Sequence, residues 1–233
     1  MRSGGGIDGP GAFLLDFDHT LFDTDRFFWI DVRAAFARFG IDGDRWEESY
    51  SQVWPFGYSL EKHLAYLIRE GQGGVSVEEA RRVLQEHFSD LRPYLFADVE
   101  PFLRRLQVLR FPCFLLSFGD PAWQTYKVRG ARIAEFFQDV FYTSKEHAKV
   151  EVVEAVVRRF GRLTVVDNDP RELDLIKARY PQIETFWITR VPPDALERFD
   201  TDTRERFREA RSYALLSPEF PHHRSQSLRE VSL

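Results

Sequence analysis

The sequence has little cysteine, no long apolar run and a small net charge. Its single cysteine, Cys113, allows no disulfide within the chain, and in an apolar segment it is expected to be a buried, inert thiol. No apolar run approaches the ~20 residues needed to cross a bilayer. The net charge of −5, from 32 basic and 37 acidic residues, offers no general attraction to nucleic acid or an anionic membrane. These absences favour a cytoplasmic protein with neither a membrane nor a nucleic-acid partner.

The composition indicates an ordinary globular chain. Hydrophobic residues make up 43% of the 233 positions and charged residues 30%, which suits one large domain or one domain with a substantial insertion. The first residues, Met1–Gly6, lack the hydrophobic region of a signal peptide, so we expect a flexible leader there.

Short apolar segments alternate with amphipathic helical patterns along most of the chain. One clear helix has apolar residues at spacings of three and four between positions 150 and 160, and it stops at Gly161. This alternation predicts an α/β fold with a doubly wound parallel sheet. The expected strands cover residues 13–15, 111–117, 140–142, 163–166 and 184–188, with a last strand at 213–216.

Residues 26–92 interrupt this alternation. They contain three helical patterns and no convincing strand. The second pattern closes near Gly71, and the third begins at Ser76, which has Glu79 three residues later as in a capping box. The segment therefore predicts a helical insertion in an α/β domain.

The expected organisation has three parts. Residues 219–233 are polar and are predicted to form a mobile tail in which His222 and His223 are solvated. The other boundaries place the α/β core at residues 1–24 and 95–218 and the helical insertion at residues 25–94.

The apolar run Phe13–Leu15 ends in two aspartates, Asp16 and Asp18. Two positions apart in extended backbone, their side chains leave the same face. Two carboxylates so close repel each other unless a cation or a shared proton lies between them. The pair is therefore a candidate metal-and-nucleophile site, although a turn rich in Asp at a strand end is also common.

Three of the expected strands end on polar residues, Asp16, Ser117 and Asp167. The carboxyl ends of parallel strands form one rim of a doubly wound sheet, and ligands bind at that rim. We therefore expect these three side chains to meet in space, although Ser and Asp are also ordinary turn residues.

These residues resemble the motifs of the haloacid dehalogenase (HAD) superfamily, whose members are mostly phosphatases. The segment Asp16–Thr20 matches the first motif, Asp-x-Asp-x-Thr, and Leu115–Ser117 matches the second, an apolar strand ending in Ser or Thr. Lys149 fits the third motif and Val165–Asp169 the fourth. The resemblance covers about residues 12–190, and a helical insertion directly after the first motif is similar to the family's helical cap class.

The resemblance implies a Rossmann-like core and a Mg²⁺-dependent phosphomonoester hydrolase that acts on a small phosphorylated metabolite. It implies that Asp16 is the nucleophile, forming an aspartyl-phosphate, and that Asp18 is the general acid and base. Ser117 and Lys149 would bind the phosphoryl group. Asp16, Asp18 through its backbone carbonyl, and Asp167 would hold the Mg²⁺.

The fourth motif departs from the usual family pattern of adjacent aspartates, or of a second aspartate four or five residues on. Asn168, Asp169 or Asp174 could support the metal here, and Asp169 before Pro170 fits a helix N-cap equally well.

Other positions leave two readings open. Lys145 competes with Lys149 for the third motif; we favour Lys149, twelve residues before Gly161. His19 is expected to contact the loop or the cap and not a metal. The aromatic segment Trp54–Tyr58 either packs internally or faces the site.

Two alternative functions remain. A phosphotransferase or mutase would use the same intermediate with another acceptor, and a catalytically silent binding protein could share the fold. A haloacid dehalogenase is disfavoured, because breaking a carbon–halogen bond does not need the proton donor that Asp18 would provide. The substrate cannot be named, since recognition on such folds lies in the cap and loops.

Overall fold

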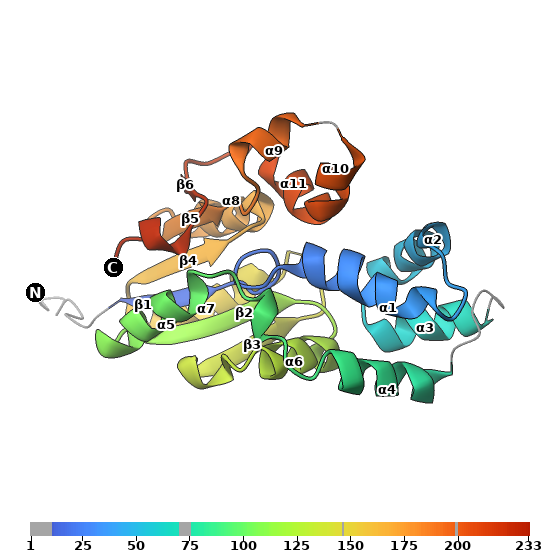
Figure 1. The fold of residues 1–233 in the computed structure, drawn as a ribbon. Helices are drawn as coiled ribbons and strands as arrows, with labels where there is room; N and C mark the ends of the chain where they lie inside the picture. Colours follow the sequence, from blue (N-terminus) through green and yellow to red (C-terminus); the bar gives the residue numbers. More distant parts are fainter. Residues whose placement is uncertain (1–10, 70–75, 146, 199) are drawn as a thin grey trace, which may run out of the picture.

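The core is a sheet of six parallel strands in the order β3-β2-β1-β4-β5-β6 (Figure 1). The computed structural model describes residues 11–69, 76–145, 147–198 and 200–233, so the expected leader lies outside the described residues. The strands are β1 (Ala12–Leu15), β2 (Cys113–Phe118), β3 (Asp139–Thr143), β4 (Leu163–Asp167), β5 (Glu184–Ile188) and β6 (His223–Ser225). The strand order reverses between β1 and β4, which is where doubly wound sheets bind ligands. The predicted fold class is confirmed.

Side chains that alternate along the strands pack into two separate hydrophobic cores, one on each face of the sheet. Phe13 and Leu15 of β1 point to one face, where α5 packs, while Leu14 points to the other, where α7 and α8 pack. Both faces are therefore covered, as a parallel sheet requires. The helices of the core are α5 (Val99–Val108), α6 (Pro121–Gly130), α7 (Lys149–Phe160) and α8 (Pro170–Arg179), with a 3₁₀ turn η4 (Ala134–Phe136) before β3.

The helical insertion extends from one end of the sheet (Figure 1), and its described residues contain no strand. Asp42 caps α2 by accepting from the Arg45 N–H, and Ser76 and Glu79 form the expected capping box of α4. The helix end predicted near Gly71 lies outside the described residues. The elements are η1 (Asp25–Val32, a π-helix), α1 (Arg33–Ala37), α2 (Gly43–Val53), η2 (Trp54–Phe56), α3 (Leu60–Arg69), α4 (Val77–His87) and η3 (Arg92–Tyr94).

The strand predicted at residues 213–216 is wrong. After β5 the chain forms three short helices, α9 (Pro193–Glu197), α10 (Thr201–Arg206) and α11 (Arg208–Ala214). Ala210 and Ala214, four residues apart, are both buried, so the apolar pattern there has the helical period. An apolar run of only four residues does not distinguish a strand from the end of a helix in the sequence.

The prediction of a mobile polar tail is also wrong. The last residues form β6 at the edge of the sheet and a 3₁₀ turn, η5 (Leu228–Glu230), and Leu228 and Val231 are buried. His222, predicted to be solvated, lies with its side chain fully buried between Asp174 and Thr185. Burial of Leu228 and Val231 outweighs the polar composition of the segment.

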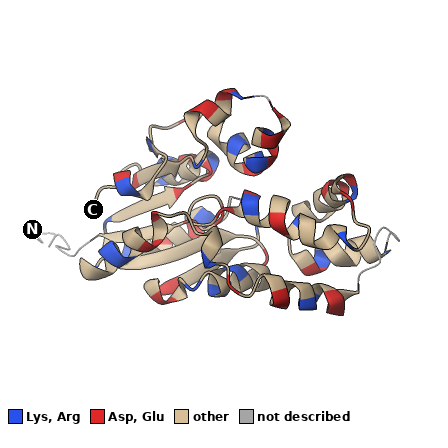
Figure 2. Ribbon diagram, in the orientation of Figure 1, with Lys and Arg blue, Asp and Glu red and all other residues tan. Residues whose placement is uncertain are grey.

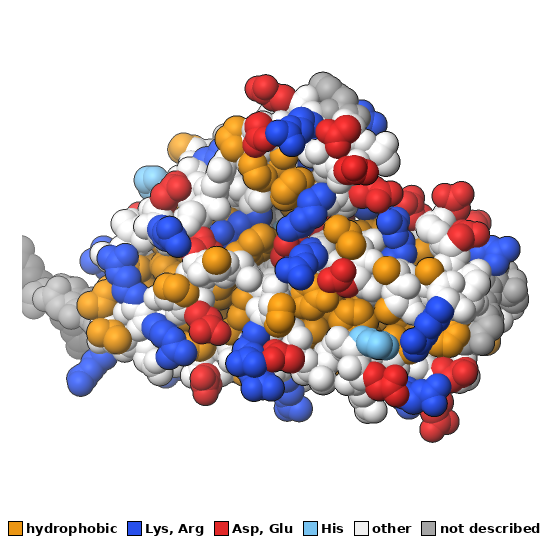
Figure 3. Space-filling model, in the orientation of Figure 1, with side chains coloured by type: hydrophobic (Ala, Val, Ile, Leu, Met, Phe, Trp, Pro, Cys, Tyr) orange, Lys and Arg blue, Asp and Glu red, His pale blue; other side chains and the backbone are white. Residues whose placement is uncertain are grey.

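Charges of both signs are interspersed along the same helices (Figure 2). On the face shown in Figure 3, apolar side chains run through the middle of the molecule below α9–α11, with Lys, Arg, Asp and Glu around them. Within the described residues, no helix combines the length and the apolar character needed to cross a membrane.

Candidate active site

A tight loop after β1 directs Asp16 and Asp18 to the rim of the sheet. The backbone carbonyl of Phe17 accepts from the N–H groups of Leu21 and Phe22, and the chain turns at His19, which has φ 57°. Glycine adopts such a positive φ without strain, and histidine is among the residues that tolerate it.

Lys149 joins the ends of β1 and β4. Its Nζ donates to Asp16 Oδ1 at 2.8 Å and to Asp167 Oδ2 at 2.7 Å, and all three side chains are buried. The other oxygen of Asp16 accepts from Thr20 Oγ1 at 2.8 Å. Lys149 is the first residue of α7, whereas Lys145 is exposed and precedes the helix.

The electrostatics of this group show an excess of buried negative charge. Burial raises the pKa of Asp16 and of Asp167, and Lys149 only partly offsets it. Burial alone would lower the pKa of Lys149, but the two carboxylates hold that pKa well above its ordinary value. One ammonium group is thus shared between two carboxylates.

Glu172 is a third carboxylate at this site, and the sequence analysis missed it. It is buried in the first turn of α8, and burial raises its pKa. Its Oε1 accepts from the His147 N–H, and Oε2 has no hydrogen-bond partner among the described residues. It stands five positions after Asp167, the spacing at which the fourth motif often carries its second acid, so a signal was present.

Ser117 and Asn168 complete the rim around Asp16. Ser117, on β2, is fully buried, and its Oγ has no partner in the described part of the chain. With its amide oriented so that both polar ends are satisfied, Asn168 donates to Asp16 Oδ2 at 3.2 Å and to the Asp18 carbonyl at 3.0 Å.

The donor set fits a divalent metal ion such as Mg²⁺. Lys149 contacts Asp16 and Asp167, and Glu172 is near enough to raise the pKa of the ammonium group as well. Glu172 Oε2, which has no partner among the described residues, is a buried oxygen that a hard cation would satisfy. Asp169 is the N-cap of α8, where it accepts from the Arg171 N–H. Asp174 accepts from the Glu219 and Phe220 N–H groups and from His222, which fixes the C-terminal segment.

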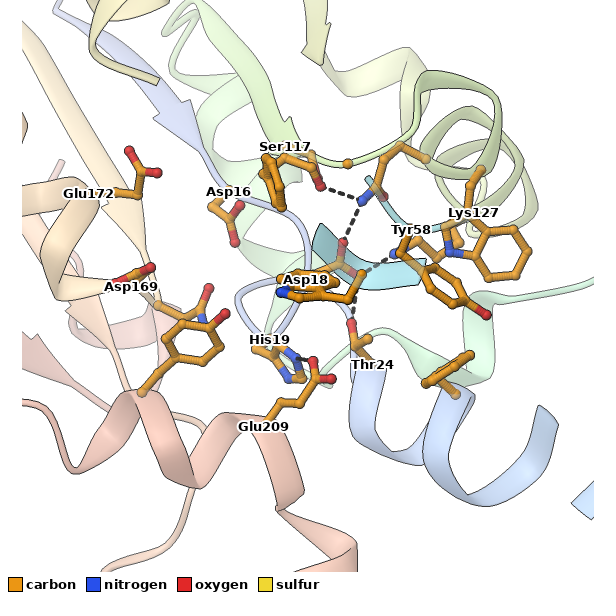
Figure 4. Close-up of a pocket in the computed structure, with 18 of the residues that line it drawn as sticks. Asp16, Asp18, His19, Thr24, Tyr58, Ser117, Lys127, Asp169, Glu172 and Glu209 are labelled. Carbon is orange, nitrogen blue, oxygen red and sulfur yellow. Dashed lines mark hydrogen bonds and ion pairs between the residues drawn. The ribbon is translucent and has the colours of Figure 1, made fainter. Parts of the chain in front are cut away.

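Asp18 is held by three donors from outside the motif. Thr24 Oγ1 donates to Oδ1 at 2.6 Å, Gln124 Nε2 donates to Oδ2 at 2.9 Å, and the Lys127 ammonium also donates to Oδ1 (Figure 4). Burial alone would raise the pKa of Asp18, but Lys127 and Thr24 hold it below its ordinary value. Gln124 and Lys127 lie three residues apart on one face of α6, and nothing in the sequence marked them.

A cavity opens above these groups, and aromatic side chains form one wall of it. About 100 Å³ is free for water-sized groups, enough for part of a small molecule. Trp54 and Tyr58 of the helical insertion contact Phe118 and Trp123 of the core, with ring centroids 5.6 and 6.1 Å apart, and all four side chains line the cavity. The segment Trp54–Tyr58 therefore reaches the site, although the side chain of Phe56 lies outside the described part.

Helix α11 closes the opposite side. Glu209 Oε2 accepts from His19 Nε2 at 3.0 Å, while Oε1 accepts from Trp29 Nε1 at 3.0 Å and from Tyr50 Oη at 2.8 Å. Burial alone would lower the pKa of His19, but Asp25 and Glu209 raise it to about 9. Asp25 in turn accepts from two backbone N–H groups of α11. His19 thus contacts Asp25, the first residue of the predicted insertion, and also Glu209 of α11, a contact that the sequence did not predict.

Comparisons with known proteins agree with this geometry. The sequence model for haloacid dehalogenase-like hydrolases matches residues 13–164. No curated protein sequence matches the chain.

Several solved structures are similar in fold. The L-2-haloacid dehalogenase of Xanthobacter autotrophicus is 15% identical, with a TM-score of 0.62 over 94% of this chain and 96% of its own. The HAD hydrolase YfnB of Bacillus subtilis, solved bound to magnesium, is 15% identical, with a TM-score of 0.58 over 95% and 96% of the two chains. A protein assigned as a beta-phosphoglucomutase from Thermotoga maritima is 15% identical, with a TM-score of 0.53 over 76% and 85%. At these identities the structures show the fold alone. The family's sequence model, however, spans more than half of the chain, and the chain therefore belongs to the haloacid dehalogenase-like hydrolase family.

Proposed function

We propose that this protein is a Mg²⁺-dependent phosphomonoester hydrolase that acts through an aspartyl-phosphate on Asp16. The observation that carries the proposal is the contact of the Lys149 ammonium with both Asp16 and Asp167, at 2.8 and 2.7 Å, where β1 and β4 end. A carboxylate nucleophile, a fixed cation and further carboxylates thus share one buried site.

The side chains suggest a division of labour. An oxygen of Asp16 attacks phosphorus, and the bond from phosphorus to the ester oxygen breaks. Asp18 gives a proton to the leaving oxygen and later takes one from the water that releases phosphate. The unpartnered Ser117 Oγ donates to a phosphoryl oxygen, and Lys149 offsets the charge that gathers there.

Asp16, Asp167, Glu172 and the Asp18 carbonyl are the groups we propose for the metal. A bound Mg²⁺ would offset the repulsion between the phosphoryl oxygens and the carboxylate. The excess of buried carboxylates and the unpartnered oxygen of Glu172 support this assignment, and so does the magnesium bound to the B. subtilis relative.

The substrate is proposed to be a small phosphorylated metabolite. Residues 25–94 would act as a cap that covers its leaving group, since Trp54 and Tyr58 line the cavity. A phosphotransferase or mutase would keep the same first step, and product analysis with an added alcohol acceptor separates it from a hydrolase.

Dehalogenation of a haloacid is a second candidate. It is favoured by Asn168, whose neutral amide pairs with Asp16 Oδ2 and the Asp18 carbonyl, two of the oxygens proposed for the metal.

One experiment compares the two candidates. Purified protein is assayed for phosphate release from p-nitrophenyl phosphate, with Mg²⁺ and with EDTA, and for chloride release from L-2-chloropropionate. Phosphate release that requires Mg²⁺ supports the proposal. Phosphate release unaffected by EDTA, or chloride release alone, rejects it.

A further inference from the structure

The amide of Gln124 is held in one orientation beside Asp18. Its Nε2 donates to Asp18 Oδ2 at 2.9 Å and to the Phe118 backbone carbonyl at 2.6 Å. The Phe118 carbonyl can only accept, so it identifies the nitrogen end of the amide whatever the protonation state of Asp18. The position of Oε1 is thereby fixed as well.

The backbone next to Gln124 is shaped to admit this amide. Gly119 has φ +136°, and a Cβ at that position would lie 2.6 Å from Gln124 Nε2. Any other residue would therefore be strained and would collide with the amide. The close approach of Gln124 to Asp18 depends on this glycine.

Among the described residues, no donor reaches Oε1 of Gln124. The residue is only 4% exposed, and Oε1 has no hydrogen-bond partner among the residues that the structure describes. Leaving a buried carbonyl unpaired is costly, so an atom of this kind calls for an explanation, such as a ligand that supplies the missing donor. Gln124 lines the same cavity as Asp16 and Asp18.

We infer that Gln124 is a specificity-determining residue that accepts a hydrogen bond from the leaving group of the substrate. The inference rests on the proposed phosphate ester hydrolysis, in which Asp18 faces the leaving oxygen. Because the Gln124 amide contacts Asp18, its Oε1 lies beside the leaving group, next to atoms that are one or two bonds away from the leaving oxygen. The donor is therefore a hydroxyl or amino group on the carbon next to the ester carbon. Lys127, on the other oxygen of Asp18, can only donate and cannot replace this acceptor.

Three small esters test the inference: 2-hydroxyethyl, 2-methoxyethyl and ethyl phosphate. The methoxy ester keeps the oxygen and its electronic effect but has no donor, and the ethyl ester controls for size. In the wild type with Mg²⁺, kcat/KM for the hydroxy ester should exceed both others by about ten- to one-hundred-fold, since a site built around a donor discriminates against analogues that lack it.

Two variants separate recognition from the positioning of Asp18. Gln124→Met keeps the length of the side chain but removes both polar atoms, so all three rates should fall and the hydroxyl preference should disappear. Lys127→Met removes the other clamp on Asp18 and should lower all three rates in the same proportion, which preserves the preference. Circular dichroism and melting curves check that both variants fold.

The possible outcomes are distinct. Equal kcat/KM for the three esters in the wild type overturns the inference without any variant, and so does a preference that survives in Gln124→Met. If p-nitrophenyl phosphate and all three esters fail to release phosphate, the proposed function is rejected, and the inference falls with it.

Discussion

Glu209 and His19 are 190 positions apart in the chain and form a hydrogen bond of 3.0 Å, in which the ring nitrogen donates. The bond joins α11 to the loop that carries Asp18. The same carboxylate accepts from Trp29 and Tyr50, which belong to the helical insertion. One side chain thus connects the loop, the insertion and the C-terminal helices.

Glu209→Gln should therefore destabilise the protein. The amide can still accept from Trp29 and Tyr50, but the substitution removes one of the two negative charges, Glu209 and Asp25, beside a buried, protonated His19. Breaking a buried ion pair in this way costs about 3 kcal/mol, which urea denaturation at pH 7 would measure as a lower free energy of unfolding.

Glu205→Gln is the matched control for this variant. Glu205, on α10, pairs with Arg33 at 3.3 Å near the surface, so its loss should change the free energy of unfolding by less than about 1 kcal/mol. Equal effects of the two substitutions would show that the contact of Glu209 with His19 contributes no more to the free energy of unfolding than a surface ion pair.

Lys149→Ala should lower the turnover of p-nitrophenyl phosphate by about 100-fold or more, because the variant loses a cation that contacts the nucleophile in a buried site. Lys145→Ala, an exposed lysine four residues earlier, should leave turnover nearly unchanged. Steady-state kinetics of both variants decide between the lysines. The reverse result would assign the third motif to Lys145.

Asp18→Asn should harm esters with poor leaving groups most. An alkoxide needs a proton as it departs, whereas p-nitrophenolate does not. The ratio of kcat/KM for p-nitrophenyl phosphate to that for ethyl phosphate should therefore rise in the variant. A ratio equal to that of the wild type would remove the acid role of Asp18.

The helical insertion should lose stability in mild acid through His63. Burial among aromatic rings lowers the pKa of His63 to about 3, from 6.5 for an exposed histidine. Between these values the unfolded chain binds a proton that the folded chain does not, so stability falls as the pH drops below 6.5. The loss should reach about 2 kcal/mol at pH 5.

Urea denaturation between pH 7 and pH 5 tests this effect. His63→Gln, which does not titrate, should remove most of the pH dependence, whereas substitution of the exposed His87 on α4 should not. If the change in the free energy of unfolding between pH 7 and pH 5 is the same in the wild type and in His63→Gln, the assignment to His63 is refuted.

The sequence predicted the parts of the site that lie at strand ends. Asp16, Ser117 and Asp167 end separate strands, and the parallel topology alone brings them to one rim. Glu172 could have been predicted from its spacing of five positions from Asp167, whereas Asp169 and Asp174, the acids nearest the motif on either side of that spacing, have other roles. Asp169 proved to be a helix cap, a reading that the sequence had left open.

Other parts could not be read from local patterns. Gln124, Lys127 and Glu209 lie on helices whose sequences carry no motif, and their roles depend on tertiary contacts with residues more than 100 positions away. Strand β6 has three polar residues and no apolar alternation, so only its backbone pairing with β5 reveals it. Here tertiary packing overrides local propensity.

The fate of oxygen from water tests the central claim most directly. Excess enzyme is allowed one turnover of p-nitrophenyl phosphate in H₂¹⁸O with Mg²⁺, and mass spectrometry then examines the released phosphate and the peptide that contains Asp16. If Asp16 carries a phosphoryl group, water attacks phosphorus, so the phosphate should contain one heavy oxygen and the Asp16 carboxylate none. Heavy oxygen in the Asp16 carboxylate and none in the phosphate would mean that water attacks the carboxyl carbon of Asp16, as it does in the ester intermediate of a dehalogenation, and would contradict the account.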